Sequence, residues 1–187
     1  MDNFFSLITD RRSTRKFTGK PLTNNQFAMI LKAALMAPTS KNAHSWQFVV
    51  VEDKNTLRQL AGCKKYGASF LEGCALAIVV LGETSRTDVW IEDASIAASY
   101  MQLQAEDLGI GSCWCQVRNR LTEDGQDSEQ YIRELLDAPQ QFGVLSIIGF
   151  GQIDQERKPV DESDLLWEKV YIEKFGMQDI PLQDLQA

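Results

Sequence analysis

The chain is poor in the residues from which metal centres and disulfide frameworks are built. It contains one histidine, His44, and four cysteines in 187 residues. The cysteines, Cys63, Cys74, Cys113 and Cys115, lack the C-x2-C spacing of zinc sites and dithiol redox motifs. One histidine cannot build a metal cluster, so we expect no metal site. We expect four free cysteines packed as small hydrophobic residues, as in a reducing cytoplasm.

Long apolar runs and an excess of positive charge are also missing. No run of about twenty apolar residues occurs, which predicts that no helix spans a membrane. The start, "MDNFFSLITD", has no basic region followed by an apolar stretch, so no signal peptide is expected. The formal net charge of -7 argues against nucleic acid or an anionic membrane as the main partner. The length and the hydrophobic content of 44% predict one domain, residues 1–187, in a cytoplasmic protein.

The common nucleotide-binding and hydrolase motifs are incomplete. "GIGSCW" follows an expected helix rather than a strand, and "GFGQID" has Asp154 where a dinucleotide fingerprint needs its third glycine. Neither a G-x-x-x-x-G-K-[ST] loop nor a G-x-S-x-G elbow is present. A Rossmann domain, a P-loop protein and an α/β-hydrolase are therefore disfavoured.

Hydrophobic periodicity predicts an α+β fold, with a small sheet between helices. Thr23 and Gln26 form a capping-box pattern at the start of a helix that Pro38 ends. The near-continuous apolar run at 74–82 predicts a strand buried on both faces. Helices are expected over 3–9, 23–37, 53–62, 88–108, 131–138 and 165–175, and strands over 46–52, 74–82, 112–118 and 142–153.

Positive charge gathers in one place, the stretch "RRSTRKF" at 11–17. Arginine presents a rigid fork of donors that meets phosphate oxygens in pairs, and the hydroxyl of Ser13 adds another donor. The segment can therefore form a phosphate cradle. A solvated charge run that pairs with surface acids is the alternative, and the residues of this stretch alone favour it.

Further motifs support the cradle. "RRSTRKF", "MAPTSKNAHSWQFVVVED", "DLGIGSCW" and "IIGFGQIDQERKP" occur in this order over residues 3–159. Together they resemble the nitroreductase family of FMN-dependent oxidoreductases. The resemblance implies a nitroreductase-like fold, with a small central mixed or antiparallel sheet flanked by helices. The second motif departs from the family pattern at His44 and Ser45, where Gln-Pro is more usual.

The resemblance implies a role for each matching residue. Near the N-terminus, Arg11, Arg12, Ser13 and Arg15 would hold the FMN phosphate and ribityl chain, with one arginine reaching the flavin N1–O2 edge. From a partner subunit, Pro38, Thr39, Ser40 and Asn42 would contact the same flavin in a homodimer. Along the strands, the backbone at Cys113 and Trp114 would approach the cofactor, and Gly149 and Gly151 would let the backbone pass close to the ring. Arg157 would return to the phosphate, with Lys158 as the alternative if the register shifts by one.

The resemblance further implies an enzyme in which NADH or NADPH reduces FMN and an electron-poor acceptor, a nitroaromatic or a quinone, takes the hydride in a ping-pong sequence. No side-chain nucleophile or metal is needed, because the flavin supplies the chemistry. Two alternatives stay open from the sequence. One is an FMN-binding sensor or carrier without turnover, and the other is an acidic interaction module without a cofactor.

Overall fold

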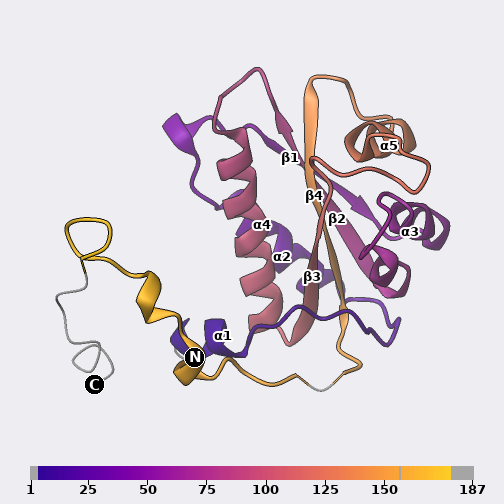
Figure 1. Ribbon diagram of the computed structural model, residues 1–187. Coiled ribbons are helices and arrows are strands. Elements are labelled where there is room, and N and C mark those ends of the chain that lie inside the picture. Colours follow the sequence, from indigo (N-terminus) through magenta and orange to yellow (C-terminus); the bar gives the residue numbers. More distant parts are fainter. Residues whose placement is uncertain (1–3, 156, 178–187) are drawn as a thin grey trace.

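One antiparallel sheet forms the centre of the protein. The computed structural model describes residues 4–155 and 157–177. Its strands lie side by side in the order β1, β2, β4, β3, and every neighbouring pair is antiparallel (Figure 1). This confirms the expected α+β class and selects the antiparallel alternative. The strand bounds are Trp46–Val51 for β1, Leu76–Glu83 for β2, Ile110–Gln116 for β3 and Phe142–Gln152 for β4.

Helices cover both faces of this sheet (Figure 1). The side chains of β2 alternate between two core clusters, with Ile78 in one and Val79 in the other. The first cluster packs against α2 and α4, and the second against α3, α5 and the 3-10 turn η2. The bounds are Phe4–Asp10 for α1, Asn24–Leu35 for α2, Lys54–Ala61 for α3, Ser69–Gly73 for η2, Trp90–Asp107 for α4 and Ser128–Leu135 for α5.

Local sequence signals account for several of these elements. The Thr23 hydroxyl accepts from the backbone N–H of Gln26, whose side chain returns to the Thr23 backbone, so the predicted capping box is confirmed. Gly109, the residue after the C-cap Leu108 of α4, has φ +68°, which is the left-handed conformation expected at a helix end. All of β2 except Glu83 is buried, as its apolar run predicted. The four cysteines are free and buried, also as predicted.

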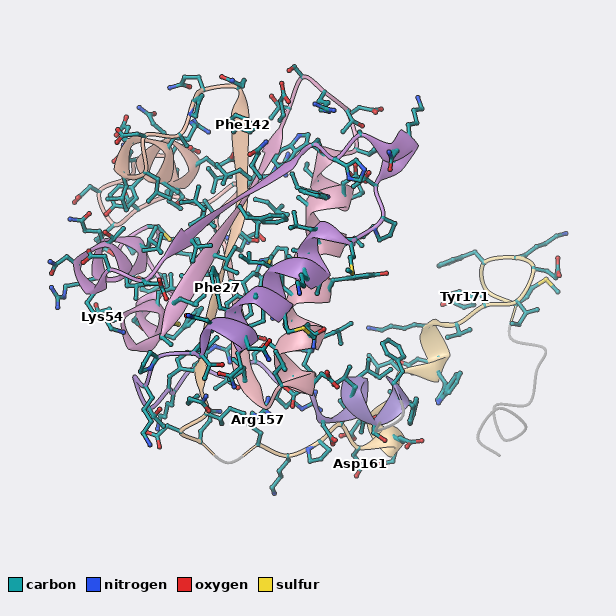
Figure 2. The ribbon with its side chains drawn as sticks, turned by 180° about the vertical axis from the view of Figure 1, so that it is seen from behind. Phe27, Lys54, Phe142, Arg157, Asp161 and Tyr171 are labelled. Carbon is teal, nitrogen blue, oxygen red and sulfur yellow. The ribbon has the colours of Figure 1, made fainter. Side chains whose placement is uncertain are left out.

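Two expectations about the helices were wrong. The helix expected from 131 begins at Ser128, because Asp127 caps it by accepting from the N–H of Gln130. The segment 165–175, expected to be helical, instead forms an arm with one short turn, η4 (Trp167–Lys169), and a second turn, η3 (Glu162–Asp164), comes just before it. A short helix needs a packed apolar face, and this arm extends away from the body of the protein (Figures 1 and 2). No helix in the described ranges is long and apolar enough to cross a membrane.

The N-terminal segment after α1 crosses the end of the sheet. The N–H of Thr14 donates to the carbonyl of Ser112 at 2.9 Å, and the N–H of Thr18 donates to the carbonyl of Gln152 at 3.0 Å. These bonds tie the basic segment to the start of β3 and the end of β4. Residues far apart in the sequence are thus brought together at one end of the sheet.

Candidate functional site

The basic segment and the segment after β4 enclose one open hollow of about 440 Å³. Side chains from near the two ends of the chain meet there. The motifs "RRSTRKF" and "IIGFGQIDQERKP" supply them. The lining residues are Arg11, Arg12, Ser13, Arg15, Gln155, Arg157 and Lys158, and this is called the cationic hollow below.

Two of these arginines, Arg12 and Arg157, link the basic segment to the segment after β4. The Nε–H of Arg12 donates to the carbonyl of Lys158 at 2.9 Å, and Arg157 donates back to the carbonyl of Arg12 at 3.3 Å. Arg157 also makes a two-pronged ion pair with Glu106, with both N···O distances 2.8 Å and both side chains largely buried. Figure 2 shows Arg157 at this end of the molecule. Part of the donor set of Arg157 is thus used by the protein itself.

Arg11 and Arg15 are placed differently. No described residue gives either side chain a hydrogen bond or an ion pair. Their backbone is nevertheless fixed, because the side-chain oxygen of Gln155 accepts from the N–H groups of Arg15 and Lys16 at 3.2 and 3.0 Å. Two uncompensated guanidinium groups on a fixed backbone form a preorganised site for an anion such as a phosphate.

A second hollow of about 520 Å³ adjoins the first, and Arg15 lines both. Its wall combines two aromatic rings with polar groups, which suits a flat heteroaromatic molecule better than a second anion. The lining residues are Arg15, Lys16, Phe17, Gly67, Ser69, Phe70, Gly73 and Asp154, and this is called the aromatic hollow below.

The strand residues Cys113 and Trp114 lie next to the basic segment. Burial raises the pKa of the Cys113 thiol, while the nearby Arg15 and a hydrogen bond with Ser13 oppose that rise. The indole N–H of Trp114 donates to the Gln116 side chain at 3.0 Å. Neither residue lines the two hollows as the structure describes them, so a backbone contact with a cofactor stays a prediction.

Two of the glycines in β4, Gly149 and Gly151, are closely packed against side chains of the protein itself. A Cβ at Gly149 would lie 2.5 Å from Sγ of Cys74 and 3.0 Å from the ring of Phe70. A Cβ at Gly151 would lie 2.9 Å from the ring of Phe17. The space beside each glycine is therefore filled by the protein's own side chains. These glycines are therefore required for internal packing, and a close approach of their backbone to a flavin ring stays a prediction.

The remaining predicted residues lie far from the cationic hollow. The N–H of Ser40, in the 3-10 turn η1 (Ser40–Asn42), donates to Asp93 in the first turn of α4, whereas Arg157 pairs with Glu106 in the last turn. Thirteen residues of α-helix separate these two acids, which corresponds to about 20 Å. Figure 1 shows η1 at the opposite end of α4 from the basic segment. Within one chain, Pro38, Thr39, Ser40 and Asn42 therefore do not share a pocket with the arginines.

The family model described as the nitroreductase family matches residues 8–65 and 59–152. The chain belongs to the nitroreductase family. A solved nitroreductase-family structure, the FMN-dependent nitroreductase of Clostridium difficile R20291, is 46% identical and has a TM-score of 0.90 over 91% of this chain and 99% of that one.

Two relatives whose names include the electron donor, NADPH or NAD(P)H, are less similar in sequence. The NADPH-flavin oxidoreductase of Vibrio harveyi is 30% identical over 204 residues, covering 100% of this chain and 80% of the relative. A protein of Archaeoglobus fulgidus, which carries the provisional name NADH dehydrogenase/NAD(P)H nitroreductase, is 32% identical over 88% of this chain and 90% of its own length. The family resemblance of the sequence motifs is thus confirmed.

Sequence motifs missed several residues that shape this nitroreductase-family site. Glu106 and Gln155 hold the arginines and their backbone, and Ser69 and Phe70 line the aromatic hollow. Glu106, Ser69 and Phe70 stand outside the motifs. Gln155 lies within "IIGFGQIDQERKP" but was not singled out, because the backbone that it holds is 140 residues away. Only the loop-like "DQERKP" segment around Gln155 gave a signal that could have drawn attention to its neighbours. Among the described residues, no group of three or more His, Cys, Asp or Glu side chains could hold a metal ion.

Proposed function

We propose that this chain is an FMN-dependent NAD(P)H oxidoreductase that reduces electron-poor acceptors of the nitroaromatic or quinone type. Family membership supports the class of reaction. The observation that carries the proposal is the pair of guanidinium groups, Arg11 and Arg15, that point into the cationic hollow without a described partner. A dianionic phosphate needs about two or three charge-assisted donors, and these two supply them.

The two hollows together match the two ends of FMN. The phosphate would lie in the cationic hollow, held by Arg11, Ser13 and Arg15, with Arg12 and Arg157 keeping the two walls together. The ring would lie in the adjoining aromatic hollow. Since Arg15 borders both, it is the arginine best placed to reach the N1–O2 edge, where a cation stabilises the reduced flavin.

We further propose a homodimer in which the loop at Pro38–Asn42 reaches the flavin of a partner subunit. The distance between this loop and the cationic hollow of its own chain supports the proposal. An apolar groove of about 360 Å³ between α1, α2 and α4, bordered by Phe4, Leu7 and Tyr100, offers a surface for a second copy. The arm beyond Asp164 presents further exposed apolar side chains, such as Phe175 at 90% exposure.

The protein's contribution to turnover would be binding, orientation and charge. When bound, FMN would accept a hydride from NADH or NADPH and deliver it to the acceptor. Arg15 would stabilise the negative charge of the reduced state, and the walls of the aromatic hollow would position the ring. Because donor and acceptor would use one site in turn, ping-pong kinetics are expected.

The decisive experiment is reconstitution with FMN followed by titration with NADH and NADPH without oxygen. We expect bound flavin at one per chain, bleaching of its visible absorbance by the pyridine nucleotide, and recovery of the colour on addition of a quinone or a nitroaromatic compound. Parallel lines in double-reciprocal plots would support the ping-pong order.

Two other results would overturn parts of the proposal. A protein that binds FMN but is never reduced by NADH or NADPH would be a flavin-binding sensor or carrier. A protein that binds no FMN would leave an acidic interaction module as the remaining reading of the sequence.

A further inference from the structure

The loop that contains η1 has an unusual backbone. Lys41, Asn42 and His44 have φ values of 48°, 57° and 45°, so three of four consecutive residues are left-handed without being glycine. Asparagine and histidine tolerate this region better than most residues, but lysine gains nothing there. Such a conformation persists only where the surroundings impose it, and it is concentrated at functional sites.

Several hydrogen bonds within the loop maintain this shape. The N–H of His44 donates to the Thr39 hydroxyl at 3.2 Å, and the N–H of Ala43 donates to the carbonyl of Ser40 at 2.9 Å. Nε2 of His44 lies 2.8 Å from the side-chain oxygen of Asn42. Since that oxygen can only accept, His44 donates from Nε2. These local bonds shape the loop but do not attach it to the rest of the protein.

Asp93 supplies a long-range attachment. Its Oδ1 accepts from the N–H of Ser40 at 2.9 Å, across 53 residues of sequence. Its side chain is 3% exposed and lies in α4 next to Ala94 and Trp90 of the helix core. No described residue donates to its other oxygen, Oδ2. A carboxylate buried in this way is costly, so its bond to the loop is the feature of the structure that accounts for it.

We propose that Asp93 is a positioning residue, whose buried carboxylate holds the 39–44 loop in the conformation that completes the flavin site of a partner subunit. The role rests on the proposed function, because the loop meets a flavin only in the proposed homodimer. Asp93 touches neither cofactor nor substrate in this arrangement. It acts through the loop backbone, while Glu106 at the other end of the same helix acts on Arg157.

The single histidine of the chain makes the proposal testable without any flavin. The His44 ring lies inside the loop and contacts the ring of Trp46 at the start of β1, so its ¹⁵N-edited NMR signals report on the loop and on how it meets β1. In the flavin-free protein we expect one set of ring signals with the proton on Nε2. Asp93→Ala should broaden or split this set, whereas Asp93→Asn should preserve it, because an amide oxygen can still accept from Ser40.

Two further variants separate loop attachment from core damage. Ser40→Pro removes the donating N–H at the surface and leaves the helix core intact, so it should disturb the His44 signals as Asp93→Ala does. Glu92→Ala removes an exposed acid from the same helix turn and should leave them unchanged. His44 signals that stay unchanged in both Asp93→Ala and Ser40→Pro would overturn the proposal, whether or not the protein binds FMN.

Flavin affinity gives a second readout that general destabilisation would not reproduce. If the loop adopts its competent conformation about one-tenth of the time in Asp93→Ala, the apparent Kd rises about tenfold. Because Arg11 and Arg15 of the flavin's own subunit would hold the phosphate, the loop of the other subunit would act on the flavin ring. FMN and riboflavin should therefore lose affinity equally, and Asp93→Asn should restore both. Wild-type affinity for both flavins in Asp93→Ala would contradict the role. Absence of flavin binding in the wild type would instead overturn the proposed function, with the His44 spectra still deciding the loop attachment.

Discussion

At the scale of single residues, the basic stretch at 11–15 contains side chains with two different tasks. Arg12 donates to the carbonyl of Lys158 and so joins two segments of backbone, whereas Arg11 has no described side-chain partner. The sequence motif does not distinguish these arginines, because both are simply cations in "RRSTRK". They differ in the folded chain, where Arg12 and not Arg11 donates a hydrogen bond to the backbone of Lys158.

This difference leads to a prediction for flavin binding. Arg11→Ala removes a donor from the cationic hollow only, so it should raise the Kd for FMN about tenfold, the effect of losing roughly 1.5 kcal/mol of charge-assisted bonding. Riboflavin, which lacks the phosphate, should bind as it does to the wild type. Arg15→Ala should weaken both ligands, because Arg15 borders both hollows.

Fluorescence titration of each flavin measures these constants directly. Lys20→Ala is the matched control, since it removes an exposed cation that lines neither hollow, and it should change neither Kd. If Arg11→Ala bound FMN as tightly as the wild type, the phosphate would have to lie elsewhere.

At the scale of elements, β4 shows why its glycines are needed. Gly149 faces Cys74 and Phe70 so closely that a methyl group does not fit. We expect Gly149→Ala to lower the free energy of unfolding by about 1–3 kcal/mol, the usual cost of overpacking a core. Cys74→Ala makes room by removing the nearest atom, so the double variant should be less destabilised than the sum of the two single variants.

Urea unfolding of the four proteins completes this cycle, and flavin titration of the same set provides the contrast. Internal packing predicts coupling in stability with little change in flavin Kd. If Gly149→Ala had normal stability but had lost affinity for FMN, the result would indicate that this glycine contacts the cofactor and is not needed for packing.

Elements with strong local signals were predictable from the sequence. Thr23 begins α2 because its hydroxyl caps the helix, and β2 was recognisable from an apolar run that only a strand buried on both faces requires. The start of α5 was missed because Asp127 stands in an acidic, loop-like stretch where one aspartate cap resembles its neighbours. Glu106 was missed for another reason, since its partner Arg157 lies 51 residues away and no local pattern links them.

At the scale of the whole molecule, the C-terminal arm differs from the helix that its local sequence predicted. The segment 165–175 has a helical composition, yet its apolar residues Leu166 and Phe175 are exposed at 56% and 90%. Since these side chains stay exposed in the described part of the chain, propensity alone could not decide the structure of the arm. Figure 2 shows Tyr171 on the arm, well away from the sheet and its helices. An apolar arm and an apolar groove on one chain are the surfaces that a second copy would bury.

The proposed homodimer leads to a prediction at this scale. Tyr100 is 41% exposed and borders the groove between α1 and α4. Tyr100→Asp would place an unpaired charge in the interface, which costs about 2–5 kcal/mol and should raise the dimer Kd by at least tenfold. Sedimentation equilibrium over a range of protein concentrations measures this constant. Leu121→Asp places the same charge at an exposed apolar residue outside the groove and should leave the dimer intact.

Flavin content links this prediction to the site. Because the Pro38–Asn42 loop would contribute to the flavin site of the partner, loss of the dimer should also release FMN. In Tyr100→Asp, bound FMN should therefore rise with protein concentration along the same curve as the dimer fraction, although Arg11 and Arg15 are intact. A Tyr100→Asp monomer that kept FMN at wild-type affinity would show that the arginines and the aromatic hollow of one chain suffice. The loop held by Asp93 would then lie outside the flavin site.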